Sequence, residues 1–162
     1  VSKLSSLAHE CRRTQPMILT MDEHAPPDET HEEQDLPKIL IAEDVDAVRI
    51  KLEYVVRALG FEPLSVTDGR RALMQFVIAQ PPIVLLDIGM PSMSGLEVCR
   101  RIRETSEDAR IVMITGDSRA EVVQEAIAAG ADDFISKPFT IERLSGSIER
   151  ILSMEKVSQR EP

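Results

Sequence analysis

The sequence has few of the features that mark secreted or membrane proteins. Only two cysteines occur among 162 residues, Cys11 and Cys99, which argues against a disulfide framework and favours a reducing compartment. No apolar run approaches about 18 residues, the length that a membrane-spanning helix needs. The N-terminus also lacks the apolar core of a secretory signal. These absences predict a cytoplasmic protein with no membrane contact.

Positive charge is also scarce. The formal net charge is -9, which disfavours a general affinity for nucleic acid or for anionic membranes. There is no basic stripe and no C-terminal helix-turn-helix pattern, so we expect no direct nucleic-acid binding. Arg100, Arg101 and Arg103 do cluster. They are more simply interpreted as the solvated face of a helix than as a docking patch.

The first 37 residues show no sustained hydrophobic period. Residues 22–35 hold seven acids, two histidines, two prolines and no Lys or Arg, a composition typical of disorder. We therefore expect a disordered acidic extension over residues 1–37, a folded domain over 38–155 and a short tail over 156–162. The extension is either a solvating segment or a docking arm. The start is Met21, or Val1 encoded by a non-ATG codon, or Val1 is a truncation point, and the sequence does not choose among them.

Beyond residue 37, short apolar runs alternate five times with amphipathic stretches. The runs occupy residues 39–42, 63–66, 83–86, 111–114 and 133–136. In the first amphipathic stretch, the apolar residues follow helical spacing up to Gly60: Val48, Leu52, Val55, Val56 and Leu59. Parallel strands need crossover helices, and continuous apolar strands need cover on both faces. The pattern predicts an α/β fold, a doubly wound parallel sheet of five strands with five helices.

Three of these apolar runs break off at ionisable residues: Glu43-Asp44, Asp87 and Lys137. Neighbouring parallel strands would bring these residues to one edge of the sheet, where open α/β folds place their sites. Mg²⁺ prefers hard oxygen ligands and keeps several waters, which suits carboxylates on loops. Zinc fits poorly because no Cys or His lies among these positions. The alternative is that Glu43-Asp44 only solvates a loop or caps a helix.

The same edge has the residue types that phosphoryl transfer uses. An aspartate such as Asp87 can attack phosphorus and form an acyl phosphate. Lys137 could neutralise a phosphoryl oxygen, and the Thr115 hydroxyl could donate a hydrogen bond to another. Taken singly, Lys137 and Thr115 are more often an ion-pair partner and a strand-end cap.

Five segments together resemble the receiver domain of two-component response regulators, over roughly residues 38–154. They are Ile-Ala-Glu43-Asp44, Leu-Leu-Asp87-Ile-Gly-Met-Pro91 with Ser-Gly95, Ile-Thr115-Gly116, Gly-Ala-Asp-Asp-Phe134 and Lys137-Pro138-Phe139. The resemblance, to the single-domain CheY-like form, implies a flavodoxin-like strand order of 2-1-3-4-5. It also implies a cis peptide bond at Lys137-Pro138, a geometry that proline makes accessible.

The resemblance further implies a role for each site residue. Asp87 would be the phosphoacceptor, and Lys137 would pair with it before phosphorylation and with the phosphoryl group afterwards. Thr115 would move toward the phosphoryl oxygens, and Phe134 would turn inward with it. Three carboxylates and one backbone carbonyl would hold Mg²⁺: Glu43, Asp44, Asp87 and Gly89. Gly89 and Asp117 lie where the family tunes the lifetime of the phosphoryl group.

The implied function is a signalling switch and not an enzyme. A sensor histidine kinase or histidine phosphotransfer protein would supply the phosphoryl group, and the phosphorylated chain would bind a downstream effector protein. With only eight residues after Met154, we expect a stand-alone receiver that is a monomer or a phosphorylation-dependent dimer. The alternatives are a phosphoryl shuttle in a multistep phosphorelay, a phosphate-independent interaction module and, least favoured, a small phosphatase that uses Asp87.

Overall fold

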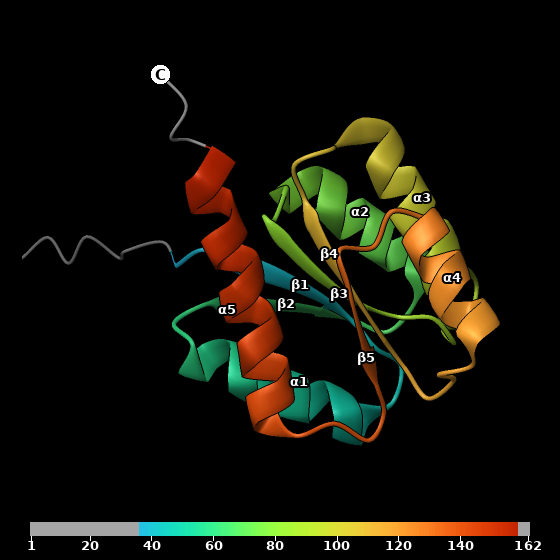
Figure 1. The fold of residues 1–162 in the computed structure, drawn as a ribbon, viewed down its shortest axis with the longest axis horizontal. Helices are drawn as coiled ribbons and strands as arrows, with labels where there is room; N and C mark the ends of the chain where they lie inside the picture. Colours follow the sequence, from blue (N-terminus) through green and yellow to red (C-terminus); the bar gives the residue numbers. More distant parts are fainter. Residues whose placement is uncertain (1–35, 159–162) are drawn as a thin grey trace, which may run out of the picture. The chain divides into compact units, whose positions relative to one another are not determined.

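A computed structural model gives the structure of this chain and describes residues 36–158 (Figure 1). The elements follow in strict β-α alternation: β1 Lys38–Ala42, α1 Asp46–Ala58, β2 Glu62–Val66, α2 Gly69–Ala79, β3 Ile83–Asp87, α3 Gly95–Thr105, β4 Arg110–Thr115, α4 Ala120–Ala128, β5 Asp133–Ser136 and α5 Ile141–Ser158. The acidic extension predicted from the sequence lies outside the described residues, except for its last two.

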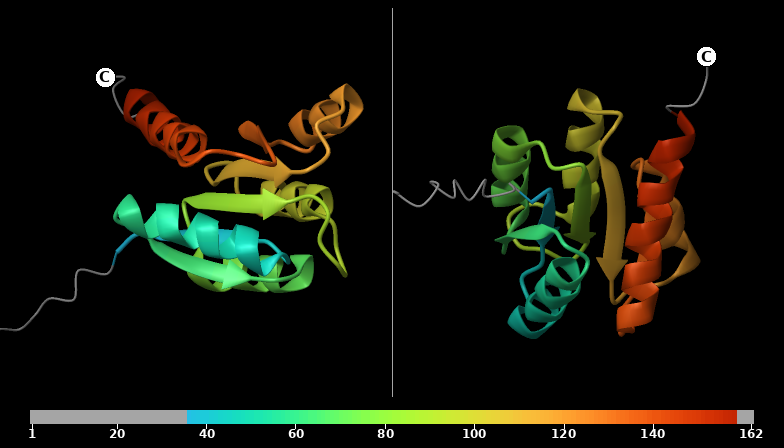
Figure 2. Two further views of the ribbon diagram at one scale, coloured as in Figure 1. Left: turned by 90° about the horizontal axis from the view of Figure 1, so that it is seen from below. Right: turned by 90° about the vertical axis from the view of Figure 1, so that its left-hand side faces the viewer.

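The strands form one parallel sheet in the order β2-β1-β3-β4-β5. Helices α1 and α5 cover one face, while α2, α3 and α4 cover the other (Figures 1 and 2). This confirms the predicted doubly wound α/β fold and the strand order that the resemblance implied. Strands β1 and β3 are paired neighbours, so their carboxyl ends lie side by side.

The apolar strands are continuous because the helices bury both of their faces. In β1, Ile39 and Ile41 pack with α1 and α5, while Leu40 packs with the opposite helices. Burying a side chain of this size contributes about 1.5–3 kcal/mol. The central strands therefore form a rigid support for the loops at their carboxyl ends.

Two strands run one residue further than the apolar runs indicated. Asp87 is the last residue of β3, and Thr115 is the last residue of β4. Their backbones are consequently fixed by strand pairing, while their side chains lie at the edge of the sheet. At the other end of the domain, α5 continues past residue 155 to Ser158. Within the described part of the chain, no helix combines the length and apolar character of a membrane span.

Candidate functional site

An acidic cluster lies at the carboxyl edge of the sheet. Glu43 and Asp44 follow β1, and Asp87 ends the neighbouring strand β3. One carboxylate oxygen from each residue lies within 4.8 Å of the other two. Glu43 is fully buried and Asp87 is nearly so, whereas Asp44 is exposed. The structure thus brings together the three acids that the sequence placed at one sheet edge.

Lys137 supplies the cation of this cluster. Its Nζ lies 2.7 Å from Oε2 of Glu43 and 3.4 Å from Oδ1 of Asp87. The sequence resemblance implied a pairing with Asp87, and the structure adds a closer contact with Glu43. The Lys137-Pro138 peptide bond is cis, as the resemblance implied. Three carboxylates facing one ammonium leave the cluster with excess negative charge.

The environment of Glu43 is unfavourable for its charge. Burial raises the pKa of the Glu43 carboxyl above its usual value, against the lowering effect of the Lys137 contact and of the Val45 N–H, and the nearby Asp87 raises it further. Oε1 accepts a hydrogen bond from the Val45 N–H at 3.1 Å, whereas the buried Oε2 pairs with Lys137 but accepts no hydrogen bond from the described residues. A cation bound here would relieve the repulsion between the acids.

Two glycines shape the space around Asp87. A Cβ on Gly95 would lie 2.1 Å from the Asp87 carbonyl oxygen, so no other residue fits there without moving the backbone. Gly89 is different, because a Cβ at this position would make only an ordinary contact of 3.7 Å with Oδ2 of Asp87. Gly89 leaves that side of the carboxylate uncovered. Its role as a backbone ligand stays a prediction.

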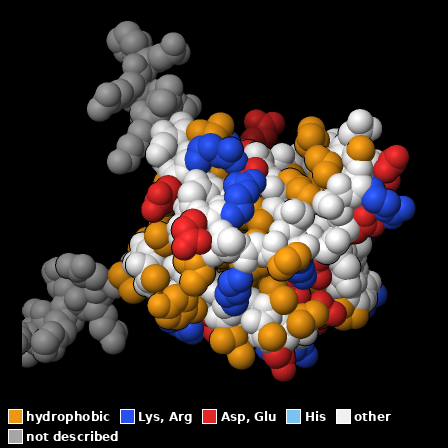
Figure 3. All heavy atoms as spheres, turned by 60° about the horizontal axis from the view of Figure 1, so that its bottom comes forward, with side chains coloured by type: hydrophobic (Ala, Val, Ile, Leu, Met, Phe, Trp, Pro, Cys, Tyr) orange, Lys and Arg blue, Asp and Glu red, His pale blue; other side chains and the backbone are white. Residues whose placement is uncertain are grey.

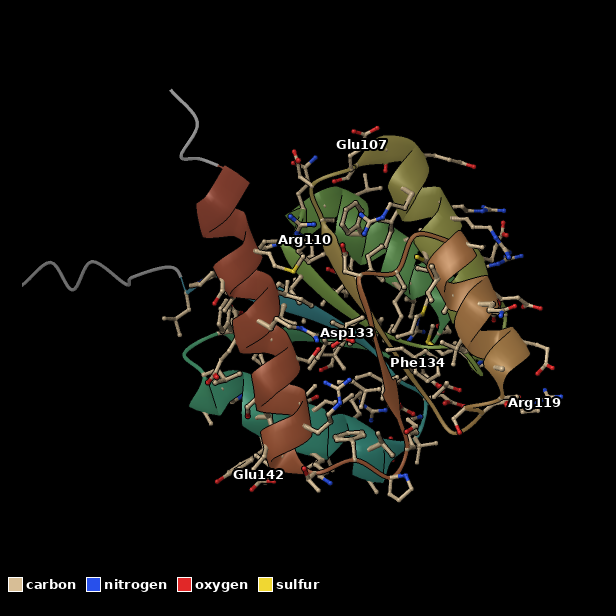
Figure 4. All side chains as sticks on the ribbon, in the orientation of Figure 1. Glu107, Arg110, Arg119, Asp133, Phe134 and Glu142 are labelled. Atoms are coloured by element: carbon tan, nitrogen blue, oxygen red, sulfur yellow. The ribbon has the colours of Figure 1, made fainter. Side chains whose placement is uncertain are left out.

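Thr115 and Phe134 lie on the two strands beyond β3. Thr115 is buried, and its hydroxyl accepts a hydrogen bond from the Asp117 N–H at 3.3 Å. Asp117 is held in turn by Arg119, whose hydrogen bonds lower the pKa of the Asp117 carboxyl. Phe134 is partly buried between β5 and α4 and packs against the core on that face (Figure 4). The movements predicted for Thr115 and Phe134 stay predictions.

Helix α1 holds both loops that flank the cluster, a function that sequence reasoning missed. Arg49 donates from Nη1 to the Glu43 carbonyl oxygen at 3.1 Å and pairs with Asp46. Lys51 donates to the Phe139 carbonyl oxygen, and its Nζ lies 4.6 Å from the centre of the Phe139 ring. The amino-acid sequence shows that α1 contains Arg49 and Lys51. It gave no indication of which carbonyl groups they reach.

Asp132, in the Gly-Ala-Asp-Asp-Phe134 segment, lies away from the cluster. It precedes β5 at the opposite edge of the sheet and is fully engaged by neighbouring groups. Its Oδ2 accepts hydrogen bonds from Arg103 at 2.7 Å and from the Ile111 N–H at 2.8 Å, and its Oδ1 accepts one from Arg110 at 3.2 Å. This carboxylate therefore ties α3, β4 and β5 together.

Asp133, the next residue, faces α5 (Figure 4). Its carboxylate accepts a hydrogen bond from the buried Ser147 hydroxyl and pairs with Arg150 and, at 3.6 Å, with Arg143. Burial works to raise the pKa of Asp133, but the hydrogen bonds from Ser147, the Phe134 N–H and Arg150 outweigh it and hold the pKa below its usual value.

Solved structures define the class to which this fold belongs. The chemotaxis response regulator CheY4 of Vibrio cholerae is 30% identical, with a TM-score of 0.68 over 72% of this chain and 98% of that one. The BeF3-activated DrrB receiver domain is also 30% identical, with a TM-score of 0.66 over 73% of this chain and 98% of that one. The fold is therefore that of the CheY-like receivers.

The sequence comparisons agree with this class. The family described as the response regulator receiver domain matches residues 39–149, and the chain belongs to that family. The phosphate regulon transcriptional regulatory protein PhoB of Rhizobium meliloti is 34% identical over 75% of this chain and 54% of its own length. The sensory transduction protein RegX3 of Mycobacterium bovis is 37% identical over 72% of this chain and 51% of its own length. The chain spans about half the length of these curated relatives.

Receiver domains generally bind Mg²⁺ at an acidic pocket, and the cluster at this sheet edge fits that ion. The three convergent side chains offer only carboxylate oxygens, the ligand type that Mg²⁺ prefers, and no His or Cys joins them. Asp44 is the most open of the three and is free to face a hydrated ion. Glu43 would contribute its charge and its buried Oε2, which pairs with Lys137 but accepts no hydrogen bond from the described part of the chain.

Proposed function

We propose that this receiver accepts a phosphoryl group on Asp87 in a Mg²⁺-dependent step and then switches its binding of a partner protein. The donor would be a phosphohistidine on a sensor histidine kinase or on a histidine phosphotransfer protein. The observation that carries this proposal is the convergence of a nearly buried Asp87 with two further acids and one ammonium. Within the described residues, this is the one group of three metal-ligating side chains.

The transfer itself is a displacement at phosphorus. An Oδ atom of Asp87 attacks, an O–P bond forms, and the P–N bond to the donor histidine breaks. The departing imidazole keeps the electron pair of that bond and leaves as neutral imidazole, with a proton that its ring already carries or that it takes from water. Mg²⁺, when bound, would neutralise charge on the phosphoryl oxygens. Lys137 is already 3.4 Å from Asp87 and can pair with those oxygens.

The readout of the switch would lie on the face formed by α4, β5 and α5. Phosphorylation replaces the single charge of the Asp87 carboxylate by a phosphoryl group that carries about -1.5 to -2, and its new oxygens would draw the Thr115 hydroxyl toward them. Phe134 lies on the adjacent strand and is only partly buried, so it has room to change its packing. A shift in the population of its conformers would change the surface that a partner protein contacts.

A labelling assay tests the acceptor. Incubation with acetyl phosphate and Mg²⁺ should add one phosphoryl group to the chain, measured by the mass of the intact protein. Asp87→Asn should abolish labelling. Asp108→Asn changes an exposed acid far from the cluster and should label like the unchanged protein. Labelling that persists in Asp87→Asn would refute the assignment of the acceptor.

Two other signalling roles remain as alternatives for the same site. A phosphoryl shuttle would pass its group from Asp87 to a histidine phosphotransfer domain, which incubation of the two purified proteins would reveal. A switch would bind its partner more tightly after phosphorylation without onward transfer. A phosphate-independent module would bind its partner equally well as the Asp87→Asn variant. The relatives are about twice as long, and stand-alone action of the chain stays a prediction.

A further inference from the structure

Helix α2 has an apolar face that the described part of the chain does not cover. Met74, Val77 and Ile78 are 61%, 68% and 71% exposed. Their i, i+3, i+4 spacing places them on one side of the helix, while Ala72 and Phe76 pack into the core on the other. Among the side chains of residues 36–154, no other helix carries three exposed large apolar groups. A cluster of this kind is typical of an interaction surface.

A groove of about 550 Å³ adjoins this apolar face at the C-terminal end of α2. The end of α2 and the segment between α3 and β4 form its walls, which include Val77, Gln80, Pro82, Thr105 and Asp108. Because Pro82 precedes β3, the groove lies at the edge of the sheet opposite Asp87. The face and the groove together are called the α2 surface here.

The two ends of the α2 surface have opposite charge. Arg70 and Arg71 begin the helix, whereas Asp108 lines the groove at its far end and Glu107 is the residue before it. Arg71 pairs with Asp68, whereas Arg70 makes no ion pair with the described part of the chain. The helix has 11 residues, which corresponds to about 16 Å. The arginines and the distant acids therefore cannot neutralise one another within one copy.

We propose that the α2 surface is a contact between two copies of this chain, with their α2 helices antiparallel about a twofold axis. A twofold contact joins one patch to itself and requires the patch to be self-complementary. Antiparallel packing would place Met74, Val77 and Ile78 of both copies at the centre. It would also bring Arg70 of one copy opposite Asp108 of the other. The opposed helix dipoles favour the same arrangement.

The size of the surface predicts a weak and reversible dimer. One helix about 16 Å long, with its adjoining groove, is at the small end of specific interfaces. We therefore expect a dissociation constant in the micromolar range. The contact requires no phosphoryl group, so its test is carried out without phosphodonor and stands or falls separately from the function proposed for Asp87.

Sedimentation equilibrium of the full chain, from about 1 μM to about 1 mM, spans the expected range of affinity. The unchanged chain should show a reversible monomer–dimer equilibrium. Ile78→Glu buries a charge at the centre of the contact and should raise the dissociation constant at least about tenfold. Ile127→Glu is the matched control, because Ile127 is an exposed residue of α4, and it should leave the constant unchanged. Met74→Gln repeats the test with a neutral side chain.

Charge reversal tests the antiparallel arrangement. Arg70→Glu and Asp108→Arg should each weaken the dimer several-fold, and the double variant should restore it. These residues are exposed, so circular dichroism should show unchanged helix content in every variant. The proposal would be overturned if the unchanged chain stays monomeric over the whole concentration range. It would also be overturned if Ile127→Glu weakens the dimer as much as Ile78→Glu, or if the double charge-reversal variant does not recover the dimer.

Discussion

Two groups of charged side chains lie at opposite edges of the same sheet, and they are organised in opposite ways. At the carboxyl edge, Glu43, Asp44 and Asp87 share the ammonium of Lys137. At the amino edge, one carboxylate, that of Asp132, accepts hydrogen bonds from two guanidinium groups and a backbone N–H. The first group has more acids than its ammonium can neutralise, whereas the single acid of the second group is paired with two guanidinium groups.

This difference separates a binding site from a structural joint. A carboxylate whose hydrogen bonds all end on protein groups is already compensated for the loss of water and gains little from a ligand. Carboxylates crowded around too few cations repel one another, and a divalent ion relieves that repulsion. The same residue type, aspartate, therefore serves for ligand binding at Asp87 and for cohesion at Asp132. The surface around α1 and α5, next to the carboxyl edge, mixes apolar and charged side chains (Figure 3).

The largest expected effect comes from removing the ammonium at the carboxyl edge. Lys137→Met leaves Glu43 and Asp87 without this partner and removes the group that would pair with the phosphoryl oxygens. We expect the rate of labelling by acetyl phosphate to fall about 100-fold. Lys38→Met, at the amino edge, is the control and should label normally. If Lys137→Met is labelled at a rate within about threefold of the unchanged chain, the loss is far smaller than expected for such a group. That result would contradict a functional role for the ammonium at the carboxyl edge.

The opposite edge should respond in stability and not in labelling. Asp132→Ala leaves the Ile111 N–H and Arg110 without this acceptor, while Arg103 keeps its hydrogen bonds to the Gly130 and Ala109 carbonyl oxygens. Losing such a partner should lower the free energy of unfolding by about 2 kcal/mol, measured by urea titration. Glu104→Ala, at an exposed position of α3, should change the free energy of unfolding by less than about 0.5 kcal/mol. A labelling defect in Asp132→Ala without loss of stability would argue against a purely structural role.

A smaller effect is expected from the groups that position the carboxyl edge. Arg49→Lys keeps the positive charge but loses the fork that reaches both the Glu43 carbonyl oxygen and Asp46. The affinity for Mg²⁺, measured by calorimetric titration, should fall by up to about tenfold. Arg57→Lys lies at the other end of α1 and serves as the control. An unchanged or higher affinity for Mg²⁺ in Arg49→Lys would contradict the role of α1 in positioning the site.

Asp133 offers the smallest and most pH-dependent effect. Its folded-state pKa is held below the usual value, so its contribution to stability is fully present above the unfolded pKa of about 4 and is lost as the pH falls through the folded value. Asp133→Asn should therefore lower the free energy of unfolding by about 1 kcal/mol near pH 7. The difference from the unchanged chain should shrink as the pH falls below about 4. A difference that is constant from neutral to acidic pH would contradict this assignment.

The sequence predicted the framework of the carboxyl edge well. Buried strands have continuous apolar runs, and the residues that break these runs mark the strand ends. Parallel strands end at the same edge, which is why the sequence pattern alone could place Glu43, Asp87 and Lys137 together. The one-residue differences at the ends of β3 and β4 arise because Asp87 and Thr115 still pair with neighbouring strands despite their polar side chains.

The other contacts of these charged side chains could not be predicted from the sequence pattern. They depend on the direction in which a long side chain, or each of two adjacent side chains, points. Lys137 has a long, flexible side chain and contacts Glu43 more closely than Asp87. Asp132 and Asp133 are neighbours in a segment that matches the family, yet one joins the amino edge and the other contacts α5. Successive residues at a strand point in opposite directions, so their partners become visible only when the helices are in place.

The most direct test of the contrast between the two edges is a Mg²⁺ titration followed by the backbone amide NMR signals of the full chain. We expect saturable shifts at Glu43, Asp44 and Asp87, with the signals of Arg103 and Asp132 unchanged. The double variant Asp44→Asn/Asp87→Asn should show no saturable shifts with Mg²⁺. Shifts that do not saturate, or that are as large around Asp132 as around Asp87, would contradict the claim that the excess of acids at the carboxyl edge forms the ion site.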